Sequence, residues 1–301
     1  MRRVSKFLAC ASAFAFFQVA TAPTASAAPI LGGDLATFAV LGQTGVTNSG
    51  LLPSTIGGNL GAITADSITS TTDPAWVFSS GSLQPNTLLA QNAQLQLDDA
   101  IVAVNDNVAS PANTIADGNL DNFQSTQLNS VIAPGTYAVA FATTNLAGTL
   151  VLDGGGSNTA VWYFKFADSL IANNGSNVIV QNVGDGSGIG IYWTVGSLAT
   201  LNGETFVGNV MAGTSITSDG GLTLTCGRLL AATGNVTLIG DTINGDCASI
   251  GTGGPGGGED SSGLDQGNPT VPGATPVPEP GTLALLGTGI AAVVARRPRK
   301  A

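Results

Sequence analysis

The chain of 301 residues contains no histidine, and only 9% of its residues are Asp, Glu, Lys or Arg. Without histidine, neither a Ser–His nor a Cys–His nucleophile pair can form. The carboxylates are scattered, and the adjacent pair Asp98 and Asp99 would face different directions on a helix, so the two could not share a substrate. These absences predict that the protein is not an enzyme.

Positive charge is nearly confined to the two ends of the chain. Seven of the nine Lys and Arg residues lie before residue 7 or after residue 295. Residues 29–250 keep only Lys165 and Arg228 against fifteen Asp and Glu, which is a net charge of 2 − 15 = −13. We call residues 29–250 the body of the chain. A body with this net negative charge repels nucleic acid and anionic lipid, so we expect no nucleic-acid partner.

The N-terminal segment has the three-part layout of a secretory signal peptide. Basic "MRRVSK" is followed by apolar "FLACASAFAFFQVA" and by small residues around Ala25-Ser26-Ala27. We therefore assign residues 1–28 to a cleaved signal and expect residues 29–250 to form one exported domain.

The C-terminus carries a second sorting pattern. A Gly/Pro-rich linker, residues 251–276, precedes Pro278-Glu279-Pro280, an apolar run from Thr282 to Ala295, and a basic tail. The run is shorter than the roughly 20 residues that span a bilayer core. Residues 277–301 closely resemble the PEP-CTERM sorting signal of Gram-negative bacteria. That resemblance implies transient inner-membrane association, cleavage by an exosortase-type enzyme, and delivery to the cell surface or matrix. The alternative is a permanent weak anchor.

Cysteine is scarce, and Cys10 is lost with the signal peptide. The mature chain keeps Cys226 and Cys247, and an even count in an oxidising compartment predicts one disulfide between them. Two thiols without histidine cannot complete a four-ligand zinc shell unless carboxylates join them. We therefore expect no metal and no other cofactor.

The body reads as many short strands and one helix. Apolar residues recur every three or four positions between Leu88 and Val108, which predicts an amphipathic helix over about 85–108. Pro85 and Asn86 are its expected start signals. Elsewhere, short stretches rich in β-branched and aromatic residues alternate with Gly and Asn, as in "AVWYFKF" and "GIYWTV".

The C-terminal third of the body repeats itself. "FVGNVMA" at 206–212 and "TCGRLLA" at 225–231 align with a shift of 225 − 206 = 19 residues. The triplets "SLA", "SIT" and "NVT", which begin at 197, 215 and 235, align with shifts of eighteen and twenty. A repeat near twenty residues made of strands and tight turns predicts a β-solenoid. The helix would then lie along one side of it and cover apolar surface.

Alternation along each strand assigns the faces of the predicted coils. Two columns are expected to point inward: Leu198, Ile216 and Val236 on one side, and Phe206, Leu224 and Ile243 on another. Their neighbours would form outward files with members about 4.8 Å apart. One face would carry Ser197, Ser215 and Asn235 beside Ala199, Thr217 and Thr237, and another would carry Thr205, Thr223 and Thr242.

An ordered set of segments resembles the microbial ice-binding (antifreeze) proteins with a discontinuous β-solenoid. The set covers residues 30–247 and includes "FAVLGQTGVTNSG", "GGNLGA", "IAPGTYAV" and "GRLLAATGNVTLIGDTIN". The resemblance implies a right-handed solenoid of triangular cross-section with a long helix alongside. It also implies that the first coil packs near the last ones, and that one flat face binds ice.

Carried onto this chain, the resemblance places the ice-binding site on the file beside the Leu198/Ile216/Val236 column. The candidate residues are Thr217 and Thr237, then Ala199, Ser215, Asn235 and Ser197, with Thr44 and Asn145 from distant coils. Residues Thr44 to Thr47 also fit the pattern Thr-Gly-X-Thr, which resembles a motif found in some of the more active members of that family. The Thr205/Thr223/Thr242 file is the rival face, ranked second because Glu204 and Asp241 beside it carry charge.

Three functions remain open from the residues alone. The first is a secreted ice-binding protein, monomeric, that adsorbs to ice crystals and inhibits their growth or recrystallisation. The second is a matrix adhesion module that binds polysaccharide through the same solenoid. The third, a solenoid polysaccharide lyase, is disfavoured because the body shows no basic or metal-bound groove.

Overall fold

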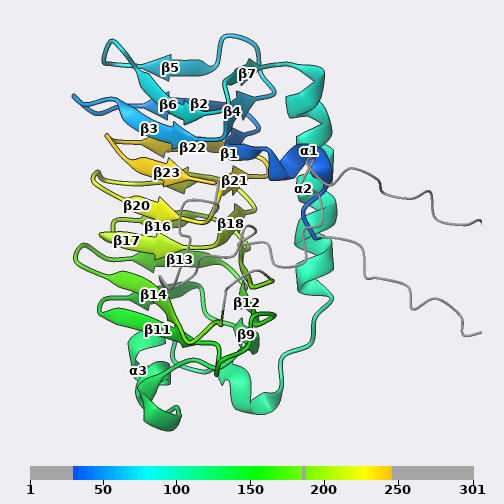
Figure 1. The fold of residues 1–301 in the computed structure, drawn as a ribbon, viewed down its shortest axis with the longest axis vertical. Coiled ribbons are helices and arrows are strands. Elements are labelled where there is room, and N and C mark those ends of the chain that lie inside the picture. Colours follow the sequence, from blue (N-terminus) through cyan, green and yellow to red (C-terminus); the bar gives the residue numbers. More distant parts are fainter. Residues whose placement is uncertain (1–29, 185–187, 246–301) are drawn as a thin grey trace, which may run out of the picture.

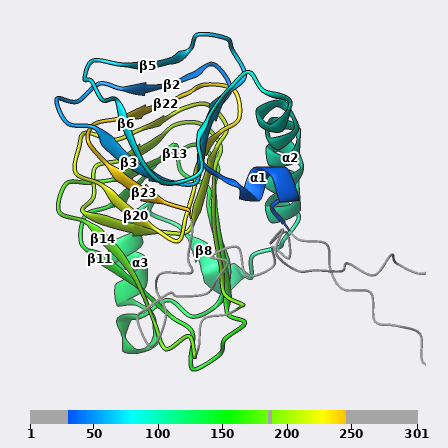
Figure 2. The same cartoon turned by 45° about the horizontal axis from the view of Figure 1, so that its top comes forward.

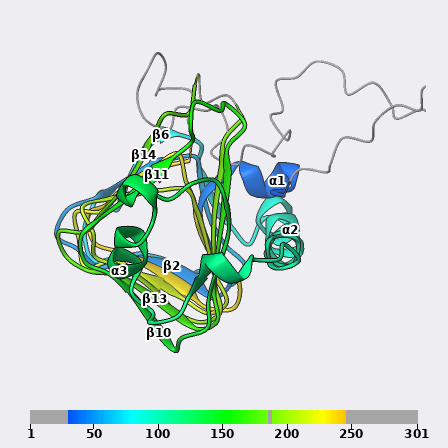
Figure 3. The same ribbon diagram turned by 90° about the horizontal axis from the view of Figure 1, so that it is seen from below.

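The computed structural model describes residues 30–184 and 188–245, and these residues form a β-solenoid of three parallel sheets with one long helix alongside (Figure 1). Seen along the solenoid, the three sheets form the sides of a triangle, as expected (Figure 3). The signal peptide, the linker, the C-terminal sorting segment and Cys247 lie outside the described residues.

The sheets are named A, B and C, and their strands are given in spatial order. Sheet A contains β7 (Leu83–Pro85), β4 (Asn59–Ala62), β1 (Phe38–Gly42), β21 (Leu229–Ala231), β18 (Asn209–Ala212), β15 (Gly190–Val195), β12 (Val161–Phe166), β9 (Gly135–Val139) and β8 (Thr114–Ile115). Sheet B contains β10 (Thr143–Leu146), β13 (Ser169–Ala172), β16 (Ala199–Leu201), β19 (Ile216–Thr217), β22 (Asn235–Leu238), β2 (Gly45–Asn48) and β5 (Ile68–Ser70). Sheet C contains β11 (Thr149–Asp153), β14 (Asn177–Gln181), β17 (Thr205–Val207), β20 (Thr223–Thr225), β23 (Thr242–Asn244), β3 (Ser54–Gly57) and β6 (Trp76–Ser80).

The coils do not stack in sequence order. Strands β1, β2 and β3 form the first coil of the chain, yet they pair on one side with β21, β22 and β23 of the last described coil. On their other side they pair with β4, β5 and β6 (Figure 2). The expected packing of the first coil near the last ones is therefore confirmed.

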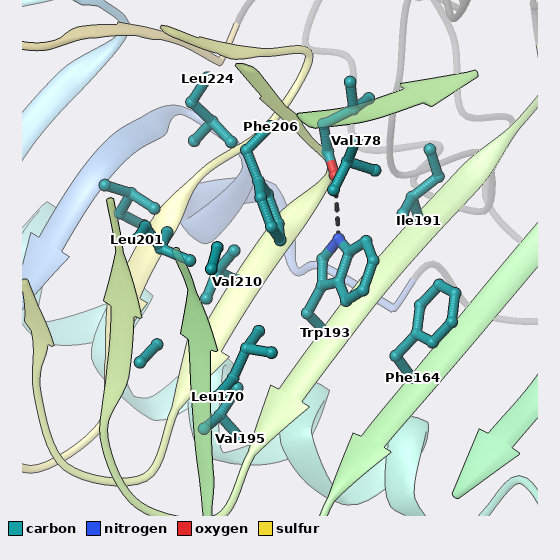
Figure 4. Close-up of a cluster of buried hydrophobic side chains, with 14 of the residues drawn as sticks. Phe164, Leu170, Val178, Ile191, Trp193, Val195, Leu201, Phe206, Val210 and Leu224 are labelled. Atoms are coloured by element: carbon teal, nitrogen blue, oxygen red, sulfur yellow. Dashed lines mark hydrogen bonds between the residues drawn. The ribbon is translucent and has the colours of Figure 1, made fainter. Parts of the chain in front are cut away.

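Apolar and aromatic side chains fill the inside of the triangle. The large members stack from coil to coil: Tyr137 on Phe164 at 5.3 Å between ring centroids, and Phe164 on Trp193 at 4.1 Å. Trp193 also donates its indole N–H to the carbonyl of Val207 at 2.9 Å, so its polar atom is satisfied inside the core (Figure 4). Because each ring packs on the ring of the next coil, the stack helps to set the register of sheet A.

Helix α2 (Leu88–Asn105) covers the outer side of sheet A (Figures 1 and 3). Its buried face, which includes Ala93, Leu97 and Ala100, joins Tyr192 and Leu230 in a second apolar cluster. The helix begins later than expected, because Pro85 ends β7 and Thr87 is the N-cap whose hydroxyl accepts from the backbone N–H of Ala90. Short α1 (Gly33–Ala36) packs against it.

One end of the solenoid is closed by α3 (Leu120–Ser125), which lies beside the edge strands β10 and β11 (Figure 1). The carboxylate of Asp121 accepts from the backbone N–H groups of Ala147 and Gly148, and the amide of Gln124 bonds Thr149 and Val151. These bonds satisfy edge groups that would otherwise be open to another strand. The short helices η1 (Pro111–Asn113) and η2 (Leu128–Ser130) flank this region in the chain.

Candidate functional site

Among the residues that the structure describes, the outer sides of two of the three sheets are not covered by a helix along their length. The outer side of sheet A is occupied by α2, whereas no described helix lies over sheet B or over the length of sheet C (Figure 3). A flat binding surface on this molecule must therefore lie on sheet B or on sheet C.

The outer side of sheet B carries one continuous file of seven residues, which we call the central file. Strand registers align its members pairwise across all seven strands. In spatial order they are Asn145, Ile171, Thr200, Thr217, Thr237, Thr47 and Thr69. Six spacings of about 4.8 Å make this file about 29 Å long.

A second outward file, the flanking file, runs beside the central file. In spatial order it contains Thr143, Ser169, the partly exposed Leu198, Ser215, Asn235 and Gly45. The Ser215 hydroxyl lies 3.0 Å from Oδ1 of Asn235, and Nδ2 of Asn235 donates to the hydroxyl of Thr237 at 2.9 Å. Such bonds hold the side chains in single orientations before any ligand arrives, which lowers the entropic cost of binding.

Five of the sequence-predicted site residues lie together on sheet B. Thr217, Thr237 and Asn145 belong to the central file, and Ser215 and Asn235 belong to the flanking file. Thr44 and Ser197 lie in the turns that enter β2 and β16, so they border the face at its corner with sheet A.

The expectation that Ala199 faces outward is wrong. Ala199 is fully buried and aligns with Ile216 and Val236 in the inward column, while Leu198, expected in that column, is 36% exposed. The structural shift between Ala199 and Ile216 is 216 − 199 = 17 residues, one fewer than the shift that aligns the triplets. A change of one residue in turn length sends every following side chain to the opposite side of the sheet.

The residue that truly occupies this place in the file is Thr200, and sequence reasoning missed it. Thr47, Thr69 and Ile171 were also missed as members of the face. The signal that could have found the three threonines is the repeated apolar–Thr–X triplet, as in Val46-Thr47-Asn48.

Sheet C carries a comparable file but a less regular surface. Its members are Thr149, Asn177, Thr205, Thr223, Thr242, Thr55 and Val77. The pairing of β14 with β17 is reduced to one residue pair, and the register between β3 and β6 shifts after Ile56. The pairings within sheet B contain no such register shift.

The outer faces of sheets B and C also differ in charge, but the residue responsible is Asp153 and not Asp241 as expected. Asp153 lies on the outer side of β11, and hydrogen bonds from the backbone of Gly155 and the amides of Gln181 and Asn182 lower the pKa of its carboxyl. Sheet C therefore carries a fixed negative charge at one end. No member of the two outward files of sheet B is charged.

Asp241 was expected to place a charge on the face of sheet C, and this expectation is wrong. Its side chain is buried at the corner between sheets B and C, where it accepts from Ser218 and from the backbone N–H groups of Leu222 and Ile239. Burial raises the pKa of the Asp241 carboxyl, although these hydrogen bonds oppose the rise. Glu204, by contrast, is exposed as expected.

The described part of the chain contains no group of three or more His, Cys, Asp or Glu residues placed to hold a metal ion. Within the same residues, no helix is both long and apolar enough to cross a membrane. Cys226 is buried, and because Cys247 lies outside the described residues, the disulfide between them stays a prediction.

Comparison with known proteins finds two families in this chain. Residues 40–244 match the family described as Ice-binding-like, and residues 276–300 match the PEP-CTERM protein-sorting motif. An "Ice-binding protein" of Nostoc sp. (strain HG1) is 34% identical over 236 residues, which cover 78% of this chain and 80% of that protein.

Solved structures with the same fold bear the same description. An ice binding protein from an Antarctic Biological Consortium superimposes with a TM-score of 0.58 at 28% identity, covering 75% of this chain and 95% of that one. The ice-binding protein of the Antarctic ascomycete Antarctomyces psychrotrophicus gives a TM-score of 0.57 at 28% identity, covering 70% and 96%. The chain described here thus belongs to the Ice-binding-like family and carries a PEP-CTERM sorting motif at its C-terminus.

Proposed function

We propose that this protein binds ice through the outer side of sheet B and inhibits the growth or recrystallisation of ice crystals. The observation that carries the proposal is the uninterrupted, uncharged central file with its five threonines, aligned across all seven strands of sheet B. Family membership and the names of the similar proteins support it.

The chemistry of the face suits ordered water. Threonine offers a methyl group that restrains neighbouring water and a hydroxyl group that anchors it. Each contact is weak, so affinity must come from many contacts acting together on a rigid surface that needs no ordering on binding. The mutual hydrogen bonds of Ser215, Asn235 and Thr237 supply such rigidity in the middle of the face.

The same face argues against the polysaccharide-binding alternative. Sugar rings are commonly held by stacking on aromatic side chains, and neither outward file of sheet B contains one. The outward tyrosines Tyr163 and Tyr192 stack on each other on sheet A, where Tyr192 is buried under α2. We further propose that the protein is not an enzyme.

The sorting motif supports an exported location. We propose that residues 1–28 are removed on export, that the linker spans residues 251–276, and that an exosortase-type enzyme of a Gram-negative cell cleaves near Pro278-Glu279-Pro280 after transient inner-membrane association. The mature domain, residues 29–250, would then act as a monomer at the cell surface or in the matrix.

Tyrosine substitutions on sheet B test the proposal. Thr217→Tyr and Thr237→Tyr place bulky rings in the middle of the central file, so flat contact with ice is lost while the strands tolerate the residue. We expect thermal hysteresis and the fraction of protein captured by a growing ice front to fall by about tenfold or more, because many weak contacts are lost together.

Thr223→Tyr on sheet C is the matched control, since it makes the same change in the rival file. It should leave both measurements unchanged, and circular dichroism should show the same fold for all three variants. If Thr223→Tyr alone removes ice capture, sheet C is the binding face; if the unsubstituted protein stays in the liquid, the proposed function is wrong.

A further inference from the structure

One end of the solenoid, which we call the open end, is formed by the edge strands β5, β6 and β7 at the top of Figure 1. Each of these strands pairs with a neighbour on one side only: β5 with β2, β6 with β3, and β7 with β4. Among the described residues, no strand continues the three sheets beyond them. The backbone N–H and C=O groups on the free side of such edge strands can pair with a further strand.

The apolar core is also incompletely covered at the open end. The core residues of the three edge strands align with fully buried residues of the strands beneath them, as Leu83 does with Leu60. In the edge strands, Leu83 is 45% exposed, and Ile68, Trp76 and Phe78 are only partly buried. A further layer of apolar side chains on this end would remove these residues from water, which favours association.

The opposite end of the solenoid is closed, and this limits which partner fits the open end. Helix α3 lies beside β10 and β11 there, and Asp121 and Gln124 bond the backbone groups of that edge. A second copy of the chain therefore offers a matching triangle of strands only at its own open end. Two identical ends pair head to head, so the contact closes after two copies and gives a dimer, not a filament.

Charge opposes this pairing. From residue 63 to residue 85, the chain that forms the open end carries two charged side chains, Asp66 and Asp73, and both are exposed. Asp66 lies between β4 and β5, at the corner between sheets A and B, and Asp73 lies between β5 and β6, at the corner between sheets B and C. The third corner, between β6 and β7, has no charged residue.

Symmetry makes the repulsion unavoidable. A two-fold axis that superimposes two such triangles head to head maps one corner onto itself and exchanges the other two. If the A/B corner or the B/C corner maps onto itself, Asp66 or Asp73 meets its own counterpart; if the C/A corner does, Asp66 meets Asp73 of the second copy twice. Every arrangement thus brings carboxylates together, and like charges opposite each other across an interface are unfavourable.

We propose that the open end is a self-association surface that is controlled by salt. Asp66 and Asp73 keep two copies apart at moderate ionic strength, so that the chain is a monomer, and screening of their charges allows the open ends to pair. The Debye length falls from about 10 Å at about 0.1 M salt to about 3 Å at about 1 M. A growing ice crystal excludes salt, so the ionic strength rises in the liquid beside it. The association itself does not depend on ice binding, but its setting beside ice rests on the proposed function of sheet B.

Sedimentation analysis of the exported chain, residues 29–301, tests the proposal at about 0.1 M and about 1 M sodium chloride. We expect a monomer at the lower concentration and a dimer at the higher one, with the dissociation constant of the dimer lowered by about tenfold or more. Asp66→Asn together with Asp73→Asn should form the dimer at both concentrations, because the repulsion is gone. Asparagine also tolerates the positive φ of 56° at residue 66, so the turn is preserved.

Asp98→Asn together with Asp99→Asn is the matched control, since it removes two exposed carboxylates from α2 and changes the net charge equally. This control should behave as the unsubstituted chain does. Adding Leu83→Lys to the variant with Asn at residues 66 and 73 should abolish its dimer, because an ammonium group then lies in the apolar centre of the open end. Circular dichroism should show the same fold for every variant.

The proposal is overturned if the unsubstituted chain stays monomeric at the higher salt concentration, or if the variant with Asn at residues 66 and 73 stays monomeric at both. It is also overturned if the α2 control dimerises at the lower concentration, or if Leu83→Lys leaves the dimer intact. A chain that dimerises as expected but is not captured by ice would instead refute the proposed function alone.

Discussion

Ala199 and Thr200 are neighbours on β16 that point to opposite sides of sheet B. Ala199 is enclosed in the core between Leu170 and Ile216, and Thr200 stands in the central file between Ile171 and Thr217. The side of the sheet, and not the residue type alone, decides whether a small side chain packs inside or meets solvent.

Substitution at these two positions should give opposite results. Thr200→Tyr should reduce ice capture with little change in stability, because its side chain faces outward. Ala199→Leu should leave the binding face intact but reduce the free energy of unfolding by about 1–3 kcal/mol, because extra methylenes overpack the core. Ice-affinity partition and urea unfolding measure the two effects, and the reverse result would contradict the register of β16.

Asp241 shows how the corner between sheets B and C is held. Its backbone N–H donates to the hydroxyl of Ser54, which in turn donates to Oδ1 of Asn48 at 3.2 Å. Asn48 and Ser54 belong to the first coil and Asp241 to the last described coil, so a buried polar network joins two coils that are distant in sequence. Such a network is stabilising only while every member keeps its partners.

The Asp241 carboxyl should make stability depend on pH. Because burial raises the pKa of this carboxyl above its ordinary value of 3.8, the folded state holds its proton more tightly than the unfolded chain. Its contribution to stability is therefore greatest below 3.8 and falls as the pH rises through the folded-state pKa.

Asp241→Asn removes this titration and also places an amide N–H₂ group among donors. We expect it to lower the free energy of unfolding by about 1–3 kcal/mol. The deficit relative to the unsubstituted protein should be larger near about pH 3 than near about pH 7. Denaturant unfolding of both proteins at the two pH values measures this deficit. A deficit that grows with pH would mean that the three hydrogen bonds lower the pKa of the Asp241 carboxyl more than burial raises it.

At the scale of elements, α2 matters because it covers a sheet that could not remain exposed. Tyr192, Met211 and Leu230 are fully buried on the outer side of sheet A only because the helix packs over them. The helix is held at its far end by Lys165 of β12, whose ammonium group donates to the carbonyls of Asn105 at 2.6 Å and Asn107 at 2.5 Å. A cation at this end also suits the helix dipole.

Lys165→Met should loosen the C-terminal turn of α2. It removes two hydrogen bonds from a charged donor, so we expect a loss of about 1–2 kcal/mol in the free energy of unfolding. Amide hydrogen exchange should accelerate at Val104 and Asn105, while ice capture stays unchanged because sheet B lies on another side of the triangle. If both hydrogen exchange and the free energy of unfolding stay unchanged, the hydrogen bonds of Lys165 do not stabilise the end of α2.

Thr87→Ala at the other end of α2 serves as the matched comparison, since it removes the N-cap hydroxyl. We expect this substitution to lower the free energy of unfolding by about 1 kcal/mol and to accelerate amide exchange at the first turn of α2 instead of the last.

At the scale of the whole molecule, the first coil of the described chain is joined to its last coils by a buried side chain. Arg228 is buried, and its guanidinium donates to the carbonyl of Ala36, 192 residues away, at 2.7 and 3.0 Å, and to Oδ1 of Asn209 at 2.9 Å. One side chain thus ties α1 and the first coil to the last coils. The first coil also pairs with the last described coil in all three sheets, through β1 and β21, β2 and β22, and β3 and β23. We therefore expect the stability of the molecule to depend on this contact between the two coils.

Arg228→Met keeps the apolar stem and removes all three donated hydrogen bonds. We expect the free energy of unfolding to fall by about 1–3 kcal/mol, which for a domain of this size lowers Tm by roughly 2–4 °C per kcal/mol. Calorimetry measures the change, and ice capture below Tm should persist. An unaltered Tm would mean that strand pairing alone holds the first coil against the last described coil.

The sequence by itself determined a large part of this protein, and residues 197–244 carried most of that inference. Their period near twenty, the lack of charged residues among the triplets and the alternation of apolar with polar residues all predict stacked coils with an outward Thr-rich face. Periodicity is a local property, and side-chain alternation follows directly from the geometry of a strand. The resemblance to a known family supplied the discontinuous order of the coils.

Only the tertiary structure decided which residues share the face. The register of β16 depends on a turn that is one residue shorter than the triplets suggest, so Thr200 and not Ala199 joins the file. Thr47 and Thr69 reach that file because the first two coils insert after the last one, and Asp241 leaves the surface for the corner beneath it. These outcomes depend on turn lengths and on contacts between distant segments, which no local pattern records.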